Sequence, residues 1–194
     1  VVGVDPSVSA NPNDECGIVV VGSTGQRKLY QRTGYVLEDA SLLGGPDEWA
    51  KQAVKMARKY RAMIVAEQNQ GGELVRMVIQ AIDPKVPVVL VHARVSKSER
   101  AEPIGAAYER GSVHHAGWFT ELEDQLTSWA PNEGMASPDR LDAVVHALTA
   151  LLVVPPKGMV GTIRSHGNLS EKKMNVKELD PVGPSSPGVP GGRT

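Results

Sequence analysis

Four carboxylates in three separate settings are the residues of this sequence whose types and positions most clearly indicate chemistry. Asp5 closes the first apolar run of the chain, and Glu67 closes a second apolar run over residues 63–67. Asp139 and Asp142 stand at the start of a helix-like segment. A buried acid at the end of a strand costs free energy unless something pairs with it. Acids brought together repel one another, and oxygen ligands in this number suit Mg²⁺ or Mn²⁺. The chemistry that follows is metal-assisted cleavage of a phosphodiester.

Each of these acids also has an ordinary structural explanation. Asp5 begins an Asp-Pro-Ser sequence that is typical of a turn, and Glu67 could be a solvated strand end. Asp139 would be favoured in the first turn of a helix by the helix dipole, which explains Asp142 less well because it lies one turn deeper. The metal site is therefore predicted from the conjunction of the four acids and not from any one of them.

Several other residues were weighed for chemistry. His146 falls on the same helical stripe as Asp142 and could lie near the metals, but a helical histidine beside apolar residues is more often structural. The pair at residues 114–115, both histidines, lacks a third ligand at metal-binding spacing and is interpreted as strand or loop. Lys97 and Arg100 are candidates for contacts with phosphates, and a solvated helix face explains them equally well. The sequence has no Walker A loop, nucleophile elbow or His-Glu-x-x-His motif, so ATP hydrolysis and serine or zinc protease chemistry have no support.

Composition limits the class of protein further. The 194 residues are enough for one domain with a hydrophobic core. Because only 4% of the residues are aromatic, we expect aliphatic side chains to make up this core. The single cysteine, Cys16, excludes an internal disulfide and any Cys-based zinc site, and we expect it to be a buried apolar side chain. Neither a membrane-spanning run nor a signal peptide is apparent, so we expect the cytoplasm and no membrane partner. The sequence begins with Val inside a strand-like run, so we expect an excised domain whose N-terminal partner is missing.

The charge is unevenly spread along the chain. Residues 155–194 carry six basic and three acidic residues, a net of +3, which leaves −4 for residues 1–154 out of a total of −1. A DNA-binding protein usually shows a basic footprint, and residues 1–154 do not. Acids that await a metal would account for part of this deficit, and another domain that holds DNA would account for the rest.

Hydrophobic periodicity predicts an order of three strands, a helix, a strand, a helix, a strand and then helices. The predicted strands cover residues 1–5, 16–22, 28–37, 62–67 and 86–92, and the predicted helices cover residues 46–60, 72–81, 97–109, 120–129 and 137–153. Short links between the first three strands indicate an antiparallel meander. Ser96 with Glu99 forms a capping-box pattern before the third helix, and Pro103 warns of a break in it. For the last helix, Ser137 is the expected N-cap and Pro138 the first helical residue.

This order predicts an α/β fold in which a mixed sheet is flanked by helices. Ligands of such sheets gather at the carboxyl ends of strands. Asp5 and Glu67 both stand at such ends, so we expect them to be neighbours in space.

Five segments of the sequence resemble the C-terminal nuclease domain of the phage terminase large subunit, in the order that this family has them. They are VGVDPS (2–7), DECGIVV (14–20), IVAEQNQGG (64–72), KSERAEP (97–103) and SPDRLDA (137–143). The resemblance spans about residues 1–153. It implies an RNase H-like fold and an endonuclease that cuts concatemeric double-stranded viral DNA with two divalent cations, Mg²⁺ or Mn²⁺.

The resemblance also implies roles and partners. It places the three catalytic, metal-binding acids on Asp5, Glu67 and Asp142, with Asp139 as an auxiliary acid near the second metal. The partners would be an N-terminal packaging ATPase domain (absent from this sequence), a small terminase subunit and a portal protein, in the cytoplasm of a host cell. Two alternatives stay open: a cellular RNase H-like nuclease such as a junction resolvase, and a non-catalytic docking module of the same fold. We expect the nuclease domain to end near residue 154 and residues 155–194, rich in Pro and Gly, to be a disordered tail.

Overall fold

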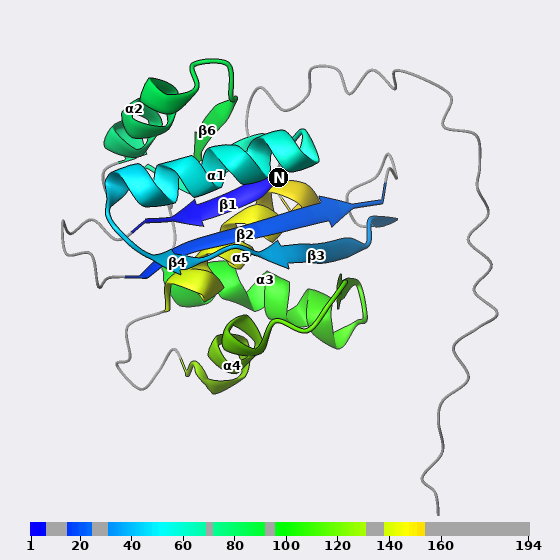
Figure 1. Ribbon diagram of the computed structural model, residues 1–194. Coiled ribbons are helices and arrows are strands. Elements are labelled where there is room, and N and C mark those ends of the chain that lie inside the picture. Colours follow the sequence, from blue (N-terminus) through cyan, green and yellow to red (C-terminus); the bar gives the residue numbers. More distant parts are fainter. Residues whose placement is uncertain (7–14, 25–30, 69–71, 92–95, 131–137, 154–194) are drawn as a thin grey trace, which may run out of the picture. The chain divides into compact units, whose positions relative to one another are not determined.

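A mixed sheet runs through the part of the chain that the computed structural model describes, which comprises residues 1–6, 15–24, 31–68, 72–91, 96–130 and 138–153. Its strands follow the order β6–β5–β1–β2–β3–β7, and β4 pairs with the start of β2 (Figure 1). The strands are β1 (Val2–Asp5), β2 (Glu15–Ser23), β3 (Gly34–Asp39), β4 (Leu42–Leu43), β5 (Ile64–Glu67), β6 (Val88–Val91) and β7 (Val113–His115).

The pairing of the strands brings two of the predicted acids to one edge of the sheet. Strands β1, β2 and β3 form the antiparallel meander that the sequence predicted. Strand β5 then pairs in parallel with β1, and β6 pairs in parallel with β5. Because Val4 is level with Ala66, the residues that follow them, Asp5 and Glu67, end neighbouring strands at the same edge.

Helices cover both faces of this sheet. One face carries α1 (Pro46–Tyr60) and α2 (Gly72–Ile82). The other carries α3 (Lys97–Glu109), α4 (Thr120–Ser128) and α5 (Asp139–Leu148), which continues into a π-helical turn, η2 (Thr149–Val153). Figure 1 shows α1 above the central strands and α3 and α4 below them. The α/β architecture with a mixed sheet between helices confirms the predicted fold class.

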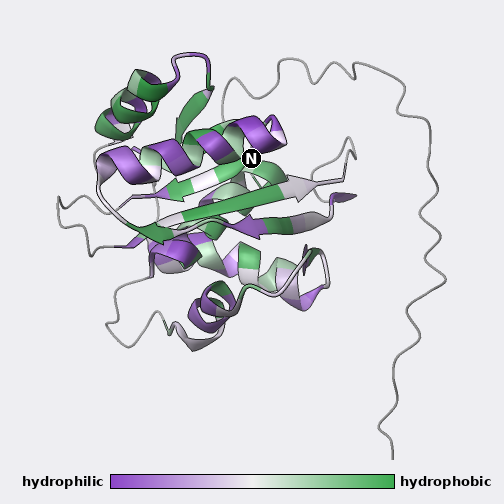
Figure 2. Cartoon of the chain, in the orientation of Figure 1, coloured by the Kyte–Doolittle hydropathy of each residue, from purple (hydrophilic) through white to green (hydrophobic). Residues whose placement is uncertain are grey.

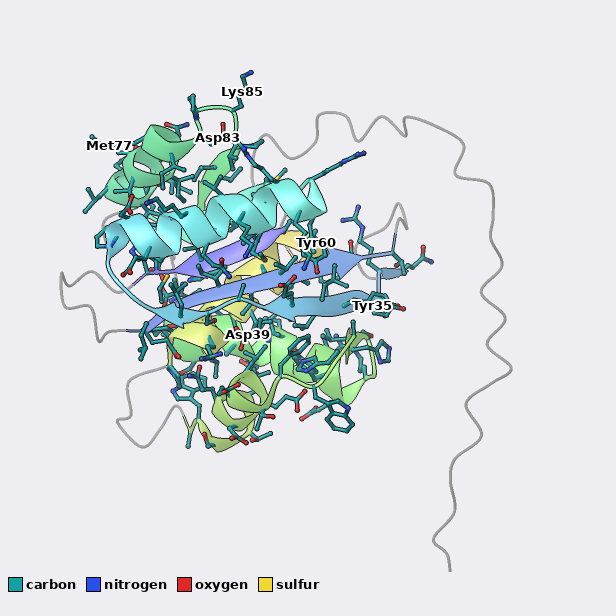
Figure 3. All side chains as sticks on the ribbon, in the orientation of Figure 1. Tyr35, Asp39, Tyr60, Met77, Asp83 and Lys85 are labelled. Carbon is teal, nitrogen blue, oxygen red and sulfur yellow. The ribbon has the colours of Figure 1, made fainter. Side chains whose placement is uncertain are left out.

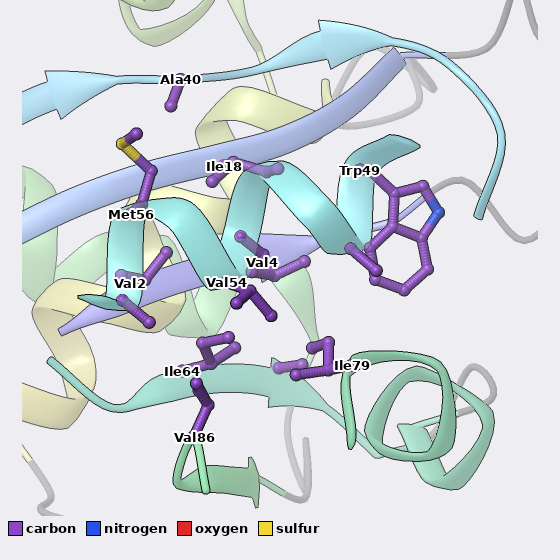
Figure 4. Packing of buried hydrophobic residues seen from close by; sticks show 14 of the residues in the cluster. Val2, Val4, Ile18, Ala40, Trp49, Val54, Met56, Ile64, Ile79 and Val86 are labelled. Atoms are coloured by element: carbon purple, nitrogen blue, oxygen red, sulfur yellow. The ribbon is translucent and has the colours of Figure 1, made fainter. Parts of the chain in front are cut away.

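Strand β2 divides the apolar residues between two cores. Its side chains alternate in direction, as those of a strand must, so Ile18 and Val20 face α1 while Val19 and Val21 face α5. Figure 4 shows the first core, where Ile18 and Val4 meet the inner side of α1, and Figure 2 shows how apolar β2 is. Cys16 is buried in the first core, as predicted.

The helices follow the sequence pattern more closely than the strands do. Helix α1 has the predicted bounds, and the capping box of α3 forms as expected between Ser96 and Glu99. Helix α3 continues through Pro103 instead of breaking there. Proline removes one helical hydrogen bond, but Ile104 and Ala107 beyond it are buried in the second core, which favours the continuous helix.

Three details of the sheet differ from the expectation. Strand β3 begins at Gly34, whereas the pattern placed its start at residue 28. The short strands β4 and β7 were not predicted as separate elements, because two or three residues are too few to show a period. Two further expectations lie beyond the sheet. The predicted tail, residues 155–194, lies outside the described residues. Within the described parts of the chain, helices of the length and apolar character needed to cross a membrane are absent.

Candidate active site

The four predicted acids come together at the edge of the sheet where β1 and β5 end. Burial raises the pKa of Asp5 to about 8, and the negative charges of Asp142 and Asp139, followed by that of Glu67, add to this effect. Lys97 acts in the opposite direction but does not cancel it. Residues that are far apart in the sequence thus act on one buried carboxyl group, which is the clustering that the sequence predicted.

Two glycines allow α5 to approach the sheet this closely. A Cβ atom on Gly3 of β1 would overlap the main-chain carbonyl of Ala143, and one on Gly17 of β2 would overlap that of Asp139. Gly17 is also level with Asp5 in the β1–β2 ladder. The main chain of α5 therefore lies directly on the two strands, and the first turn of the helix stands over the end of β1.

The N-terminus of α5 is capped by a residue from another helix. Its N-cap is Pro138, which has no side-chain hydrogen bond to offer. Instead, Oε1 of Gln125 in α4 accepts hydrogen bonds from the main-chain N–H groups of Arg140 (3.1 Å) and Leu141 (3.3 Å). This corrects the predicted start of the helix by one residue, since Pro138 precedes the first turn; the predicted cap, Ser137, lies outside the described residues.

An ion-pair network holds the same turn against the sheet. The guanidinium of Arg140 contacts Oε1 of Glu15 at 2.8 Å and Oδ2 of Asp39 at 2.5 Å; Asp39 is labelled in Figure 3. Nε2 of Gln125 donates to the other carboxylate oxygen of Glu15 at 3.0 Å. These contacts join β2, β3 and α4 to the helix that carries Asp142. Sequence reasoning missed all of them, because the partners are 101 to 125 residues apart.

Two cations from α3 neutralise two of the acids. Nζ of Lys97 lies 2.5 Å from Oδ2 of Asp142, and Nη1 of Arg100 lies 2.9 Å from Oε2 of Glu67. Both cations stand in the first turn and a half of α3, which places them at the acidic edge of the sheet. Their contacts with carboxylates are what the structure contains; contacts with DNA phosphates stay a prediction.

His146 also reaches Glu67, although the sequence pattern favoured a structural histidine over one near the metals. It is 4% exposed, and its Nε2 atom lies 3.3 Å from Oε2 of Glu67 without a well-aligned hydrogen bond. The imidazole of His146, and after it the guanidinium of Arg100, lower the pKa of Glu67 to about 2 although burial opposes them. The histidine pair at residues 114–115 lies elsewhere, in β7, which pairs with the start of β3.

The donor set fits a hard divalent cation in its chemistry. Four carboxylates provide the oxygen ligands that Mg²⁺ and Mn²⁺ prefer. Burial, and after it the neighbouring negative charges, raise the pKa of Asp5, and a cation would favour its ionised form. Among the described residues, however, the side chains do not converge in a ready-made set of three metal ligands. Oδ2 of Asp142 is in contact with Lys97, and Oε2 of Glu67 is in contact with Arg100.

Comparison with known proteins gives the family. A family model described as the terminase RNaseH-like domain matches residues 2–151, and the chain belongs to this family. The crystal structure of the large terminase nuclease from thermophilic phage G20c is similar, with a TM-score of 0.51 and 13% sequence identity over 76% of this chain and 80% of that one. A search of curated proteins finds no match. The resemblance in the sequence and the RNase H-like fold are thereby confirmed.

Proposed function

We propose that this chain is the metal-dependent endonuclease domain of a viral DNA-packaging terminase and hydrolyses double-stranded DNA at the edge where β1 and β5 end. The observation that carries the proposal is the position of Asp5. Its carboxyl group is buried among Asp142, Asp139 and Glu67, and its pKa is about 8. A protein gains nothing in stability from such a cluster, so a bound cation is the simplest reason for it.

The acids divide the work in this proposal. Asp5 would contribute to the binding of both cations, Glu67 and Asp142 would complete the two sites, and Asp139 would assist at the second. When bound there, two divalent cations supply an activated water and stabilise the charge that develops on the leaving oxygen. The carboxylates then need only to hold and orient the cations, and no side chain has to act as a nucleophile.

Lys97 and Arg100 would bind the DNA backbone beside the scissile phosphate. A cation that takes up the carboxylate of Asp142 competes with Lys97, and Arg100 contacts Glu67 at the same edge. Residues 1–154 carry a net charge of about −4 from their composition, so binding of DNA by this domain alone should be weak and sensitive to salt. The packaging ATPase domain, the small terminase subunit and the portal protein are the proposed partners, in the host cytoplasm.

A non-catalytic docking module is the second candidate, and one observation favours it. The Lys97–Asp142 and Arg100–Glu67 pairs neutralise two acids without any metal. Asp5 argues against this candidate, because these pairs leave its pKa raised to about 8. A cellular junction resolvase is less favoured, since the family match is to the terminase domain.

Incubation of supercoiled plasmid with the 194-residue chain tests the proposal. Nicked and linear DNA should form with Mn²⁺ or Mg²⁺ and should not form with EDTA. The variant Asp5→Asn, prepared in parallel, controls for a contaminating nuclease. Activity that is equal with and without chelator would exclude the metal mechanism, and an inactive chain that still binds Mn²⁺ would favour the docking module.

A further inference from the structure

His146 is a buried polar residue that the proposed function leaves unused. Its side chain is 4% exposed in α5, and Nε2 has no well-aligned hydrogen-bond partner among the described residues. A buried donor or acceptor without a partner is costly and rare in native proteins. Nε2 nevertheless lies at the acidic edge, 3.3 Å from Oε2 of Glu67. This position suggests that His146 has a function at the site.

His146 and Arg100 both contact the same carboxylate oxygen of Glu67. Nη1 of Arg100 is 2.9 Å from Oε2, and Nε2 of His146 is 3.3 Å from the same atom. Within the described parts of the chain, Oε1 takes part in neither a hydrogen bond nor an ion pair. The two oxygens of one carboxylate are thus in different surroundings, one held from two sides and one available.

The two contacts come from the two helices that carry the rest of the site. Arg100 belongs to α3, next to Lys97, and His146 follows Asp142 by one helical turn in α5. Residues four apart lie on the same side of a helix. Helix α5 therefore carries one acid of the site and also a residue that contacts the acid at the end of β5.

We propose that His146 is a positioning residue which, together with Arg100, holds Oε2 of Glu67 so that Oε1 is the oxygen presented to a divalent cation. This role rests on the proposed metal site and deepens it. Hydrogen-bonded partners behind a ligand fix its orientation, and their loss typically weakens metal binding by about 10- to 100-fold. Imidazole is also a metal ligand itself, and the test has to separate that direct role from a role through Glu67.

Calorimetric titration with Mn²⁺ alone, without DNA, makes this separation. His146→Phe replaces the imidazole with an aromatic ring that has no nitrogen atoms. His146→Gln keeps an N–H donor, in its side-chain amide, near the position of Nε2. We expect His146→Phe to weaken Mn²⁺ binding by about 10- to 100-fold and His146→Gln to stay within about threefold of the unmodified chain. The exposed histidine of β7 provides the matched control, His114→Phe, which should bind Mn²⁺ normally.

Two results of the titration would overturn the proposal. Unchanged binding in His146→Phe would show that the contact with Glu67 does not matter. Equal losses in His146→Phe and His146→Gln would show that the imidazole itself is needed, as a direct ligand would be. Cleavage is measured separately: a chain that binds Mn²⁺ in the predicted pattern but cuts no plasmid would refute the proposed function and support the role of His146.

A measurement on the metal-free chain covers the case in which His146→Phe does not fold or the chain binds no Mn²⁺. Nitrogen-15 NMR of the histidine side chains reports which ring nitrogen carries the proton. A donor to Glu67 must be protonated at Nε2, so we expect a proton at that atom in the unmodified chain at neutral pH. An imidazole protonated only at Nδ1 would overturn the proposal whatever the metal does.

Discussion

Nζ of Lys97 lies 2.5 Å from Oδ2 of Asp142. Lys97, the first residue of α3, thus places its positive charge beside the carboxylate of Asp142, which is buried in α5. The ammonium group is partly exposed, whereas the carboxylate is 6% exposed at its side chain. In the metal-free chain this pair does part of what a cation would do. A divalent cation that binds Asp142 has to displace it or share the carboxylate with it.

The first prediction is that Lys97→Met strengthens Mn²⁺ binding and weakens DNA binding. A pair with one partner this exposed contributes about 0.2–1 kcal/mol, so the gain in Mn²⁺ affinity should be roughly 1.4- to 5-fold. Calorimetry measures the first effect and a gel shift at low salt the second. Lys51→Met is the matched control, because the Lys51–Asp47 pair has the same 2.5 Å distance but lies on the exposed side of α1. Weaker Mn²⁺ binding in Lys97→Met would contradict the competition.

The second prediction concerns the acids one by one. Asp5→Ala, Glu67→Ala and Asp142→Ala should each abolish most cleavage of plasmid and leave the circular dichroism spectrum unchanged. Asp139→Asn should have a smaller effect, because part of its role is to stabilise the N-terminus of α5. Full activity in Asp142→Ala combined with loss in Asp139→Ala would show that the third ligand was assigned to the wrong acid. Asp47→Asn, at an exposed position of α1, should behave as the unmodified chain.

The sequence predicted the parts of this site that depend on local pattern. Asp5 and Glu67 end apolar strands, and parallel pairing of such strands places their ends together whatever the rest of the fold. The capping box before Lys97 and the stripe that carries Asp142 are local signals too. These patterns were sufficient to predict the mixed sheet and the acidic cluster.

The sequence could not predict contacts that depend on how distant elements pack. Gln125 caps a helix that begins 14 positions later in the chain, and no residue near Pro138 indicates that it does. His146 has the pattern of a structural histidine, and only the packing of α5 against β5 shows that it meets Glu67. For residues 114–115 of β7 the sequence does not distinguish strand from loop, because three residues carry no recognisable alternation.

The third prediction follows from the raised pKa of Asp5. The folded chain retains a proton on Asp5 up to about pH 8, whereas the unfolded chain releases it near pH 4. The folded state therefore binds more protons between these values, and the contribution of Asp5 to stability falls as the pH rises from about 4 to about 8. The pKa of Glu67 is lowered from 4.5 to about 2, so its contribution to stability is present above pH 4.5 and is lost as the pH falls toward 2.

Thermal unfolding in EDTA at several pH values measures this effect. The melting temperature of Asp5→Asn should exceed that of the unmodified chain at pH 8, and the difference should shrink toward pH 5. Saturating Mn²⁺ should remove the penalty in the unmodified chain, because the cation compensates the ionised carboxylate. A difference that grows toward acidic pH would have the opposite sign and would exclude a raised pKa.

The fourth prediction concerns the cap that α4 provides for α5. Gln125→Leu keeps much of the side-chain volume but leaves the N–H groups of Arg140 and Leu141 without their acceptor. Loss of an N-cap costs about 0.5–2 kcal/mol, and the affected turn carries Asp139 and Asp142. We expect faster hydrogen exchange at those two N–H groups and weaker Mn²⁺ binding. Gln80→Leu, on the exposed side of α2, should change neither; unchanged exchange in Gln125→Leu would mean that another group caps the helix.

The last prediction tests the close approach of α5 to the sheet. In Gly17→Ala, the added Cβ meets the main-chain carbonyl of Asp139 and the N atom of Arg140, which belong to the backbone of α5 and cannot rotate away. The helix must move off β2, and the acids of its first turn must move with it away from Asp5. We therefore expect a lower melting temperature and weaker Mn²⁺ binding. The matched control is Gly105→Ala in α3, where the added Cβ meets nothing within 4 Å.

The two alanine variants should change stability in opposite directions. Glycine inside a helix is less favourable than alanine by roughly 0.5–1 kcal/mol, so Gly105→Ala should raise the melting temperature and leave Mn²⁺ binding unchanged. Gly17→Ala should lower both, and a melting temperature that falls while Mn²⁺ affinity holds would mean that the acids stay together when the helix moves. That result would contradict the view that contact of α5 with Gly17 is what places Asp139 and Asp142 beside Asp5.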